Sequence, residues 1–345
     1  MDGRTLTPRR PEARLALVVL AAGVALLAGL IWLAGENALR ALVALVQGGF
    51  LTPSGLADTV VRAIPLCLIG LGVACAFRAG VFNIGGDGQL LIGACAAVAV
   101  VPLLAGLPAP LALAGLMLAG MAGGAAWGLV AGVLKARFGA NEIIATIMLN
   151  YIAVQVLSWL VRGPLQEPAG VFPRSARLPG ELRLPVLIDG TRISAGLVVA
   201  LVAVGVVWIL LARSRWGYGV TLTGQNAEAA RYGGVRPGWV AISVLAAGGA
   251  LAGLAGTVEV AGLHGRLQEG FATGFGITAI AVALLARLNP LWVPVTAMGF
   301  AGLYVGSGTV ARATAVPFPL VNVIEAVVIL GFLALGVLRR RPALE

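Results

Sequence analysis

The sequence predicts an all-α polytopic membrane protein with about ten transmembrane helices, some of them short or broken, in two weakly related halves. Hydrophobic residues make up 59% of the 345 residues and charged residues 11%, whereas soluble domains have about 45 to 50% and about 25%. Apolar runs of about 20 residues, enough to cross a bilayer as a helix, recur along the chain. The 49 glycines are about twice the usual share of roughly 7%, which indicates closely packed and broken helices.

Charges, prolines and glycine clusters divide the apolar sequence into ten predicted spans, of which the third, eighth and ninth are short or interrupted. The first follows basic residues, as a signal peptide would, but it exceeds the roughly 7 to 15 apolar residues of a signal core, which favours a retained span. One membrane domain at 15–338 is expected between tails at 1–14 and 339–345. The spans are predicted at 15–34, 58–77, 84–101, 111–134, 142–161, 193–211, 239–262, 271–286, 291–307 and 318–338.

The basic residues predict the orientation, because Arg and Lys concentrate on the cytoplasmic side of membrane proteins. Both termini and the polar segment 213–238 are therefore expected in the cytoplasm. The proline-rich loop 162–192 is expected outside, where its mixed charges suit contact with another protein. Fifteen of the 24 basic residues then lie inside: Arg4, Arg9, Arg10, Arg14, Arg78, Lys135, Arg137, Arg213, Arg215, Arg231, Arg236, Arg287, Arg339, Arg340 and Arg341.

Several functions are excluded by what the sequence lacks. The one lysine, Lys135, lies between Leu and Ala, whereas a phosphate-binding Walker loop needs Lys between Gly and Ser or Thr. The sole histidine, His264, excludes an H-E-x-x-H metalloprotease. The three cysteines lack C-x-x-C spacing, and the basic residues flank apolar runs instead of forming a nucleic-acid-binding patch. We therefore expect no enzyme, metal site or cofactor, and any transport must be powered by a partner or an ion gradient.

Polar residues at broken helix starts are the main candidates for a translocation path. Asn83, Asp87 and Gln89 lie among glycines before a short apolar helix. An ionised carboxylate at membrane depth costs roughly 2.5 to 3.5 kcal/mol, so it needs partners or a watery cavity. Asp87 is equally suited to capping a helix N-terminus and to lining such a cavity.

The segment 268–283, which includes Phe275, repeats this arrangement in the second half of the chain. Other polar residues occur at helical spacing, where they bond to neighbouring helices or face a path: Asn141, Glu142, Thr146 and Asn150 in one predicted span, and Asn322 and Glu325 in the last. The predicted path residues are Asn83, Asp87, Gln89, Asn141, Glu142, Asn150, Phe275 and Asn322.

Two further patterns concern packing and a cytoplasmic helix. Glycines at every fourth position, Gly120 to Gly132, predict a stripe for close helix contact, and Gly249 with Gly253 and Gly302 with Gly306 repeat the spacing. In the segment 213–238 a short helix from Asn226 to Tyr232 is expected, with Asn226 as N-cap and Gly233 and Gly234 as stop signals. This helix is either a lever for another protein or an ordinary connection.

Four segments together carry a resemblance to a known family: FNIGGDGQLLIGA at 82–94, ANEIIATIMLNYI at 140–152 with VRGPL at 161–165, GQNAEAARYGG at 224–234, and IAVALLA at 280–286. The chain resembles permease subunits of bacterial ABC importers of the branched-chain amino acid, ribose and nucleoside group, and most closely those for nucleosides or simple sugars. Asp87 departs from the pattern, in which Glu is expected.

The resemblance implies a path shared by two permease subunits in the bacterial inner membrane, two cytoplasmic ATPases and an external substrate-binding protein. Residues similar to the ATPase-coupling helix are Gly224, Asn226, Glu228, Ala229, Ala230, Tyr232 and Gly233. The alternative function is a proton-coupled secondary transporter of a small polar solute, with Glu325, Glu142 or Glu259 as the proton relay.

Overall fold

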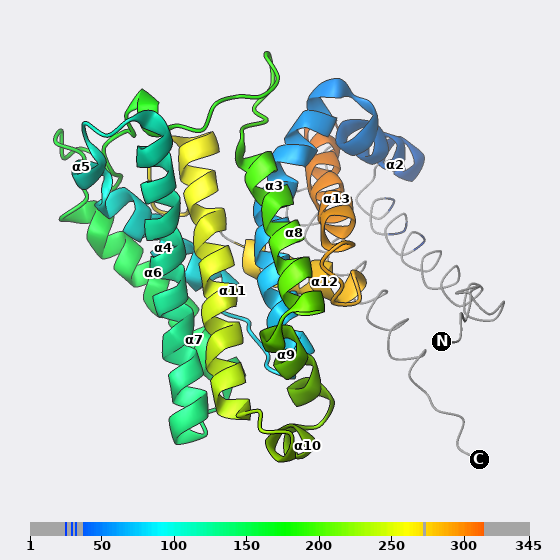
Figure 1. Cartoon of the computed structure of the whole chain (residues 1–345). Helices are drawn as coiled ribbons and strands as arrows, with labels where there is room; N and C mark the ends of the chain where they lie inside the picture. The colour runs from blue at the N-terminus through cyan, green and yellow to red at the C-terminus, as the bar shows by residue number, and fades with distance from the viewer. Residues whose placement is uncertain (1–24, 26–28, 30–31, 33–36, 272–273, 314–345) are drawn as a thin grey trace. The chain divides into compact units, whose positions relative to one another are not determined.

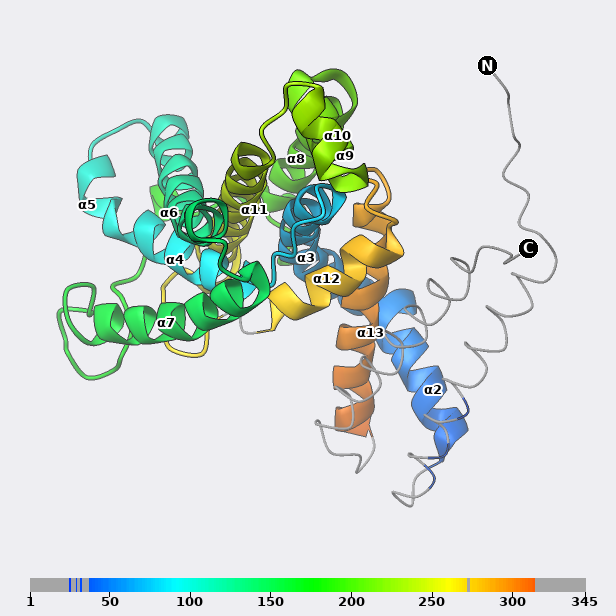
Figure 2. The ribbon, with the colours of Figure 1, turned by 90° about the horizontal axis from the view of Figure 1, so that it is seen from below.

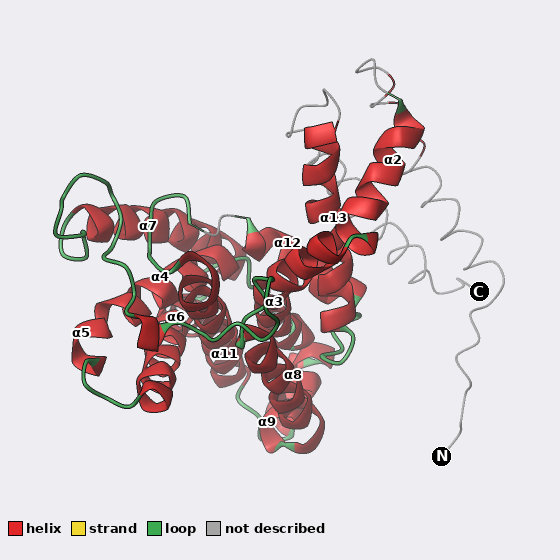
Figure 3. Ribbon diagram, turned by 90° about the horizontal axis from the view of Figure 1, so that it is seen from above, coloured by secondary structure: helices red, strands yellow, loops and turns green. Residues whose placement is uncertain are grey.

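The computed structural model describes residues 25, 29, 32, 37–271 and 274–313. Within these residues helices are joined by loops, and β-structure is limited to isolated bridges (Figure 3). The all-helical prediction is therefore confirmed for this part of the chain. The predicted last span lies outside the described residues, as does the first apart from residues 25, 29 and 32.

The chain divides into two compact units, Met1–Thr59 with Phe300–Glu345, and Val60–Gly299. In the first, α2 (Ala38–Val46) continues into a π-helical turn, η1 (Gln47–Leu51). The C-terminal part of α13 (Val293–Ala313) packs on it so closely that side chains at Gly302 and Gly306 would collide with Phe50 and Leu45. The packing predicted for these two glycines is confirmed. The helix at α2 was not predicted, because Gly48, Gly49 and Pro53 interrupt the apolar run there.

The second unit holds most of the helices, coloured from cyan to orange in Figure 1. Six described helices are long and apolar enough to cross a membrane, and five of them are α3, α6, α7, α8 and α11 with its π-helical extension η3. The sixth, α13, has 21 residues, so the ninth predicted span is not short. The bounds are α3 Pro53–Arg78, α4 Gly86–Ala99, α5 Val101–Leu104, α6 Ala109–Phe138, α7 Glu142–Arg162, α8 Gly196–Arg213, α9 Arg215–Gln225, α10 Ala227–Tyr232, α11 Pro237–Glu259, η3 Val260–His264 and α12 Phe275–Leu285.

The third and eighth predicted spans are confirmed as short within the described residues. The span at 84–101 is mainly α4, with 14 residues, and the span at 271–286 is α12, with 11. At 1.5 Å per residue these helices extend only about 21 Å and about 17 Å, against a hydrocarbon core of about 30 Å. Both helices begin after glycine-rich segments, which shorten the helical part of each predicted span.

The glycine stripe of α6 packs against α11, as predicted. Side chains at Gly120, Gly124 and Gly128 would collide with Thr257 or with the backbone of Gly249 and Leu245. The absence of side chains thus allows two backbones to approach closely. α4 lies against α6, α7 and α11 in the same unit (Figure 2).

The predicted outer loop is attached to the segment between η3 and α12. It contains one short 3-10 turn, η2 (Gly180–Leu182). The backbone N–H groups of Ser175 and Leu178 donate to the carbonyls of Leu267 and Gly265, both at 2.8 Å. These bonds hold the loop against the residues that directly follow η3.

Candidate functional site

The polar segment between α3 and α4 is closed by a pair of amide side chains. Asn83 Nδ2 donates to Gln89 Oε1 at 3.0 Å, and Gln89 Nε2 donates back to Asn83 Oδ1 at 3.2 Å. The Gly85 N–H also donates to Asn83 Oδ1, at 3.0 Å. Both side chains are only 2% exposed, so in this conformation they hold the loop before α4 in place.

One face of α7 supplies the hydrogen bonds that this non-helical backbone lacks. Glu142, Thr146 and Asn150 are spaced four residues apart and point to the segment 82–88. Thr146 Oγ1 accepts from the Ile84 N–H at 3.3 Å, and Asn150 accepts from the Gly88 N–H at 2.8 Å while donating to the Ile84 carbonyl at 2.9 Å. Unwound backbone at membrane depth is tolerated where it is satisfied in this way.

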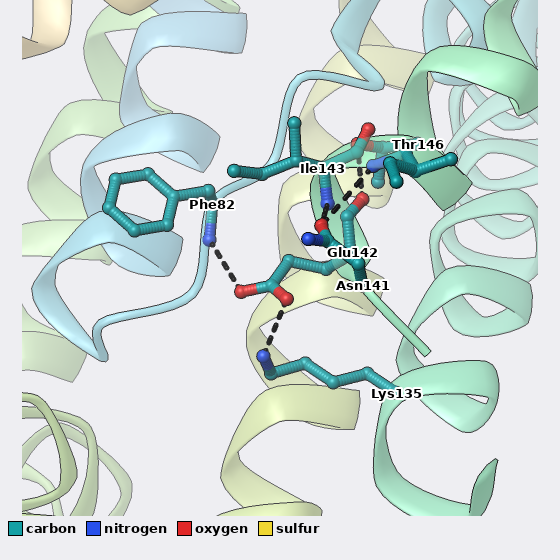
Figure 4. Close-up of polar contacts among 7 residues, drawn as sticks. Phe82, Lys135, Asn141, Glu142, Ile143 and Thr146 are labelled. Carbon is teal, nitrogen blue, oxygen red and sulfur yellow. Dashed lines mark hydrogen bonds and ion pairs between the residues drawn. The ribbon is translucent and has the colours of Figure 1, made fainter. Parts of the chain in front are cut away.

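Glu142 extends the same contact to a charged partner. Its Oε1 accepts from the Phe82 N–H at 3.4 Å, and its Oε2 lies 2.6 Å from Lys135 Nζ at the end of α6 (Figure 4). Asn141 caps α7, because its Oδ1 accepts from the Ile143 N–H at 2.9 Å. The only lysine of the chain therefore balances a carboxylate that supports the broken segment.

Asp87 joins the N-termini of the two short helices. It lies in the first turn of α4, and its Oδ1 accepts from the Gly276 N–H of α12 at 2.8 Å. The neighbouring Phe275 is 5% exposed, with the Arg62 guanidinium 4.8 Å from its ring centre. Asp87 thus accepts a hydrogen bond at the N-terminus of α12, as the capping interpretation expects. Phe275 is packed inside the unit.

The remaining intramembrane candidates differ in position. Asn322 and Glu325 lie outside the described residues. Glu259 is 4% exposed, and its Oε2 lies 3.4 Å from His264 Nδ1. The structure therefore brings Asn83, Gln89, Glu142 and Asn150 together around one segment, with Asp87 at its end and Glu259 paired with a different residue.

The predicted short helix of the segment 213–238 is present as α10. Asn226 Oδ1 accepts from the N–H groups of Glu228 and Ala229 at 2.9 and 3.0 Å, so Asn226 is the N-cap. Gly233 ends the helix. Tyr232 is 94% exposed, whereas Ala230 is fully buried. The preceding helix α9 was not predicted, because its polar and glycine residues were interpreted as a loop.

The C-terminal end of α9 touches the residues that end α3 and lead into the non-helical segment before α4. A side chain at Gly224 would collide with the Arg78 carbonyl oxygen and lie 3.2 Å from the Ala79 carbonyl carbon. Gly80, with a φ of +72°, lies directly opposite Gly224. The C-terminal end of α9 therefore abuts the residues that lead into the segment bound by α7.

This arrangement of short and long apolar helices occurs in a chain that matches a known transport family. Residues 55–337 match the family described as the permease component of the branched-chain amino acid transport system. The chain belongs to this permease family.

Several relatives of the permease have names that specify a solute. It is 40% identical over 289 residues to the glucose ABC transporter permease protein TsgB13 of Haloferax volcanii, covering 80% of this chain and 75% of the relative. It is 34% identical over 318 residues to the guanosine ABC transporter permease protein NupP of Bacillus subtilis, covering 91% of each. It is 28% identical over 282 residues to the nucleoside ABC transporter permease protein NupB of Lactococcus lactis, covering 79% and 77%. These relatives are transport components, not enzymes.

Sequence reasoning about the permease missed several partners. The spacing of Thr146 and Asn150 indicated one polar face. The backbone that these residues and Glu142 bind lies about 60 residues away in sequence. The ion pair of Arg162 with Glu269 joins residues 107 apart. No local pattern identifies such partners, since they depend on how the helices pack.

Proposed function

We propose that this permease forms the translocation path for nucleosides or related simple sugars in an ATP-driven importer of the bacterial inner membrane. The observation that carries the proposal is its similarity over 91% of both chains to a permease named for guanosine. The relative named for glucose supports the same class, because guanosine and glucose share a hydroxylated sugar ring.

The proposed path passes the meeting point of α4 and α12. In many transporters, discontinuous helices place their N-termini and freed backbone groups at the solute site near the middle of the membrane. α4 and α12 meet in this way at Asp87 and Gly276. We assign the path to Asn83, Asp87, Gln89, Asn141, Glu142, Asn150 and Phe275, and to Asn322 of the last predicted span.

The proposed contact with a separate cytoplasmic ATPase is α10. α10 has six residues, a capped N-terminus and a tyrosine that is 94% exposed, so it offers a short exposed helix to a partner protein. The Gly224 contact with Arg78 gives its movement a direct route to the segment before α4. The proposed coupling residues are Asn226, Glu228, Ala229, Tyr232 and Gly233 at the ATPase contact, Gly224 at the contact with Arg78, and the buried Ala230, which fixes the helix to its own unit.

Further partners complete the proposed importer. A second permease subunit, the same chain or a related one, would share the path, and both termini of each would lie in the cytoplasm. An external substrate-binding protein would contact the outer loop 162–192. The hydrogen bonds of this loop to residues 265–267 support that assignment, because docking there would act on the segment that joins η3 to α12.

The proton-coupled alternative has less support. Glu142 already bonds to Lys135 and to the Phe82 N–H, so it is held as a structural anion. Membership of an ABC permease family favours ATP as the energy source.

Reconstitution in proteoliposomes tests the proposal. The chain would be purified with its ATPase and supplied with its binding protein, and uptake of radiolabelled guanosine and glucose would be measured. We expect accumulation that requires ATP, stops with vanadate and continues with a protonophore. Accumulation by the chain alone in response to a proton gradient would contradict the proposal and favour the secondary transporter.

A further inference from the structure

A basic cavity lies where α6 ends and α11 begins. It has a volume of about 740 Å³ and is lined by residues of α6, α10, α11 and the α10–α11 connection. Three arginines contribute to it from different elements: Arg137 from the last turn of α6, Arg231 from the last turn of α10, and Arg236 at the N-cap of α11. All three side chains are exposed.

The three positive charges have no carboxylate partner within the part of the chain that the structure describes. The ion pairs found there use Lys135, Arg162, Arg174, His264 and Arg266 as their basic members. No side chain caps the start of α11, so the partial positive charge of that helix end adds to the same region. An anionic ligand would relieve the repulsion among the arginines.

Apolar side chains line the cavity beside the three arginines. Val133 and Ile242 line it, and so does Trp239, which is 64% exposed. On α6 the apolar surface continues from Val133 to Leu129 and Val130, which are 43% and 41% exposed. Tryptophan at the end of a membrane-spanning helix is typical of the membrane interface.

We propose that this cavity binds the phosphate group of an anionic phospholipid, with the acyl chains along the exposed face of α6. The arginines provide the charge and hydrogen-bond donors that a phosphate needs. The apolar walls beside them, at the ends of two membrane-length helices, match the acyl part of a lipid and have no function for a free phosphate ion. Basic pockets between membrane helices are suited to anionic headgroups in this way.

Native mass spectrometry of the full-length protein in detergent tests the site. The protein would be titrated with phosphatidylglycerol or phosphatidylcholine, and the bound lipids counted. We expect a preference for phosphatidylglycerol that falls about fivefold for each of Arg137→Gln, Arg231→Gln and Arg236→Gln, the equivalent of about 1 kcal/mol per arginine. The triple Arg→Lys variant should keep most of the preference, because it retains the charge.

The matched control is Arg213→Gln with Arg215→Gln, two exposed arginines of the same predicted cytoplasmic segment that do not line the cavity. This control should keep the preference, and thermal melting should show all variants folded. Equal binding of both lipids, equal loss in the control, or complete displacement by millimolar inorganic phosphate would overturn the proposal. So would cavity variants that lose ATPase association but keep the lipid preference, since the arginines would then serve a protein contact.

Discussion

The carboxylate of Asp87 accepts a 2.8 Å hydrogen bond from the backbone N–H of Gly276, a residue 189 positions later in the chain. Asp87 lies in the first turn of α4 and Gly276 in the first turn of α12. Two helix N-termini therefore share one carboxylate, whose charge opposes the partial positive charge of both ends. Both helices are too short to cross a bilayer alone. The contact between Asp87 and Gly276 joins their N-termini.

The first prediction concerns the space at this contact. In Gly276→Ala the added Cβ would lie 2.6 Å from the Asp87 backbone nitrogen and 2.9 Å from its Cγ. Overpacking of this kind costs about 1 to 3 kcal/mol. We expect a lower melting temperature in detergent and loss of solute uptake in proteoliposomes.

Gly205→Ala is the matched control, because no atom lies within 4 Å of its added Cβ on α8. It should melt at or slightly above the temperature of the unmodified protein, since Ala favours a helix over Gly by about 1 kcal/mol. Equal stability and uptake in both variants would show that the Asp87 contact is not tightly packed.

The second prediction concerns the hydroxyl of Thr146. Thr146→Val removes the acceptor of the Ile84 N–H with little change in shape. A buried donor without a partner costs about 1 to 3 kcal/mol, so the free energy of unfolding should fall by that amount. Thr146→Ser retains the oxygen and should be less than half as destabilising. Equal losses in the two variants would assign the effect to the methyl group.

The long helices and the end signals of α10 followed directly from the sequence. Runs of apolar residues predicted α3, α6, α7, α8 and α11 to within a few residues, because a bilayer imposes length and composition on each helix. Asn226 and Gly233 marked the ends of α10, since caps are local interactions.

The meeting point of the short helices and the partners of the polar residues did not follow in the same way. α4 and α12 were expected to be short, but the hydrogen bond at which they meet joins residues 189 positions apart. Lys135 and Glu142 are only seven positions apart in sequence, yet their ion pair depends on the turn between α6 and α7. Tertiary packing, which one sequence does not display, determines both.

The third prediction uses pH to test the outer ion pair. Arg162 Nε and Nη2 donate to the two carboxylate oxygens of Glu269 at 2.7 and 2.9 Å, and the Ser158 hydroxyl donates as well. These bonds to Arg162 and Ser158 lower the pKa of Glu269 to about 2, against about 4.3 for a free Glu. The folded pKa is depressed, so the stabilisation is present above about pH 4.3 and is lost as the pH falls toward 2.

Glu269→Gln should therefore melt below the unmodified protein at pH 6, with a difference that shrinks by pH 3. The difference should be modest, because the Arg162 and Glu269 side chains are 63% and 32% exposed. Glu181 lies in the predicted outer loop that begins at Arg162 and forms none of the ion pairs found among the described residues, so Glu181→Gln should show no such pH dependence. A difference that is constant from pH 6 to pH 3 would count against the ion pair.

The fourth prediction separates the surface of α10 from its attachment. Ala229 is exposed and Ala230 is fully buried. Ala229→Arg should weaken association with the ATPase without changing the melting temperature. Ala230→Arg should lower the melting temperature, because a charged side chain has no space or partner there. Unchanged pull-down of the ATPase by Ala229→Arg would contradict the coupling assignment of α10.

The last prediction concerns the route from α10 to the broken segment. In Gly224→Ala the new methyl group would press on the Arg78 carbonyl, directly before the segment that Glu142, Thr146 and Asn150 hold. We expect the ATPase to remain bound, because the contacting surface of α10 is unchanged, while uptake falls at least tenfold for the same rate of ATP hydrolysis. Gly219→Ala, on the same helix α9, is the control, since its added Cβ would meet neighbours only at 3.5 Å or more. Loss of uptake in proportion to ATP hydrolysis would instead place the defect at the ATPase, and normal uptake would show that the Gly224 contact transmits no movement.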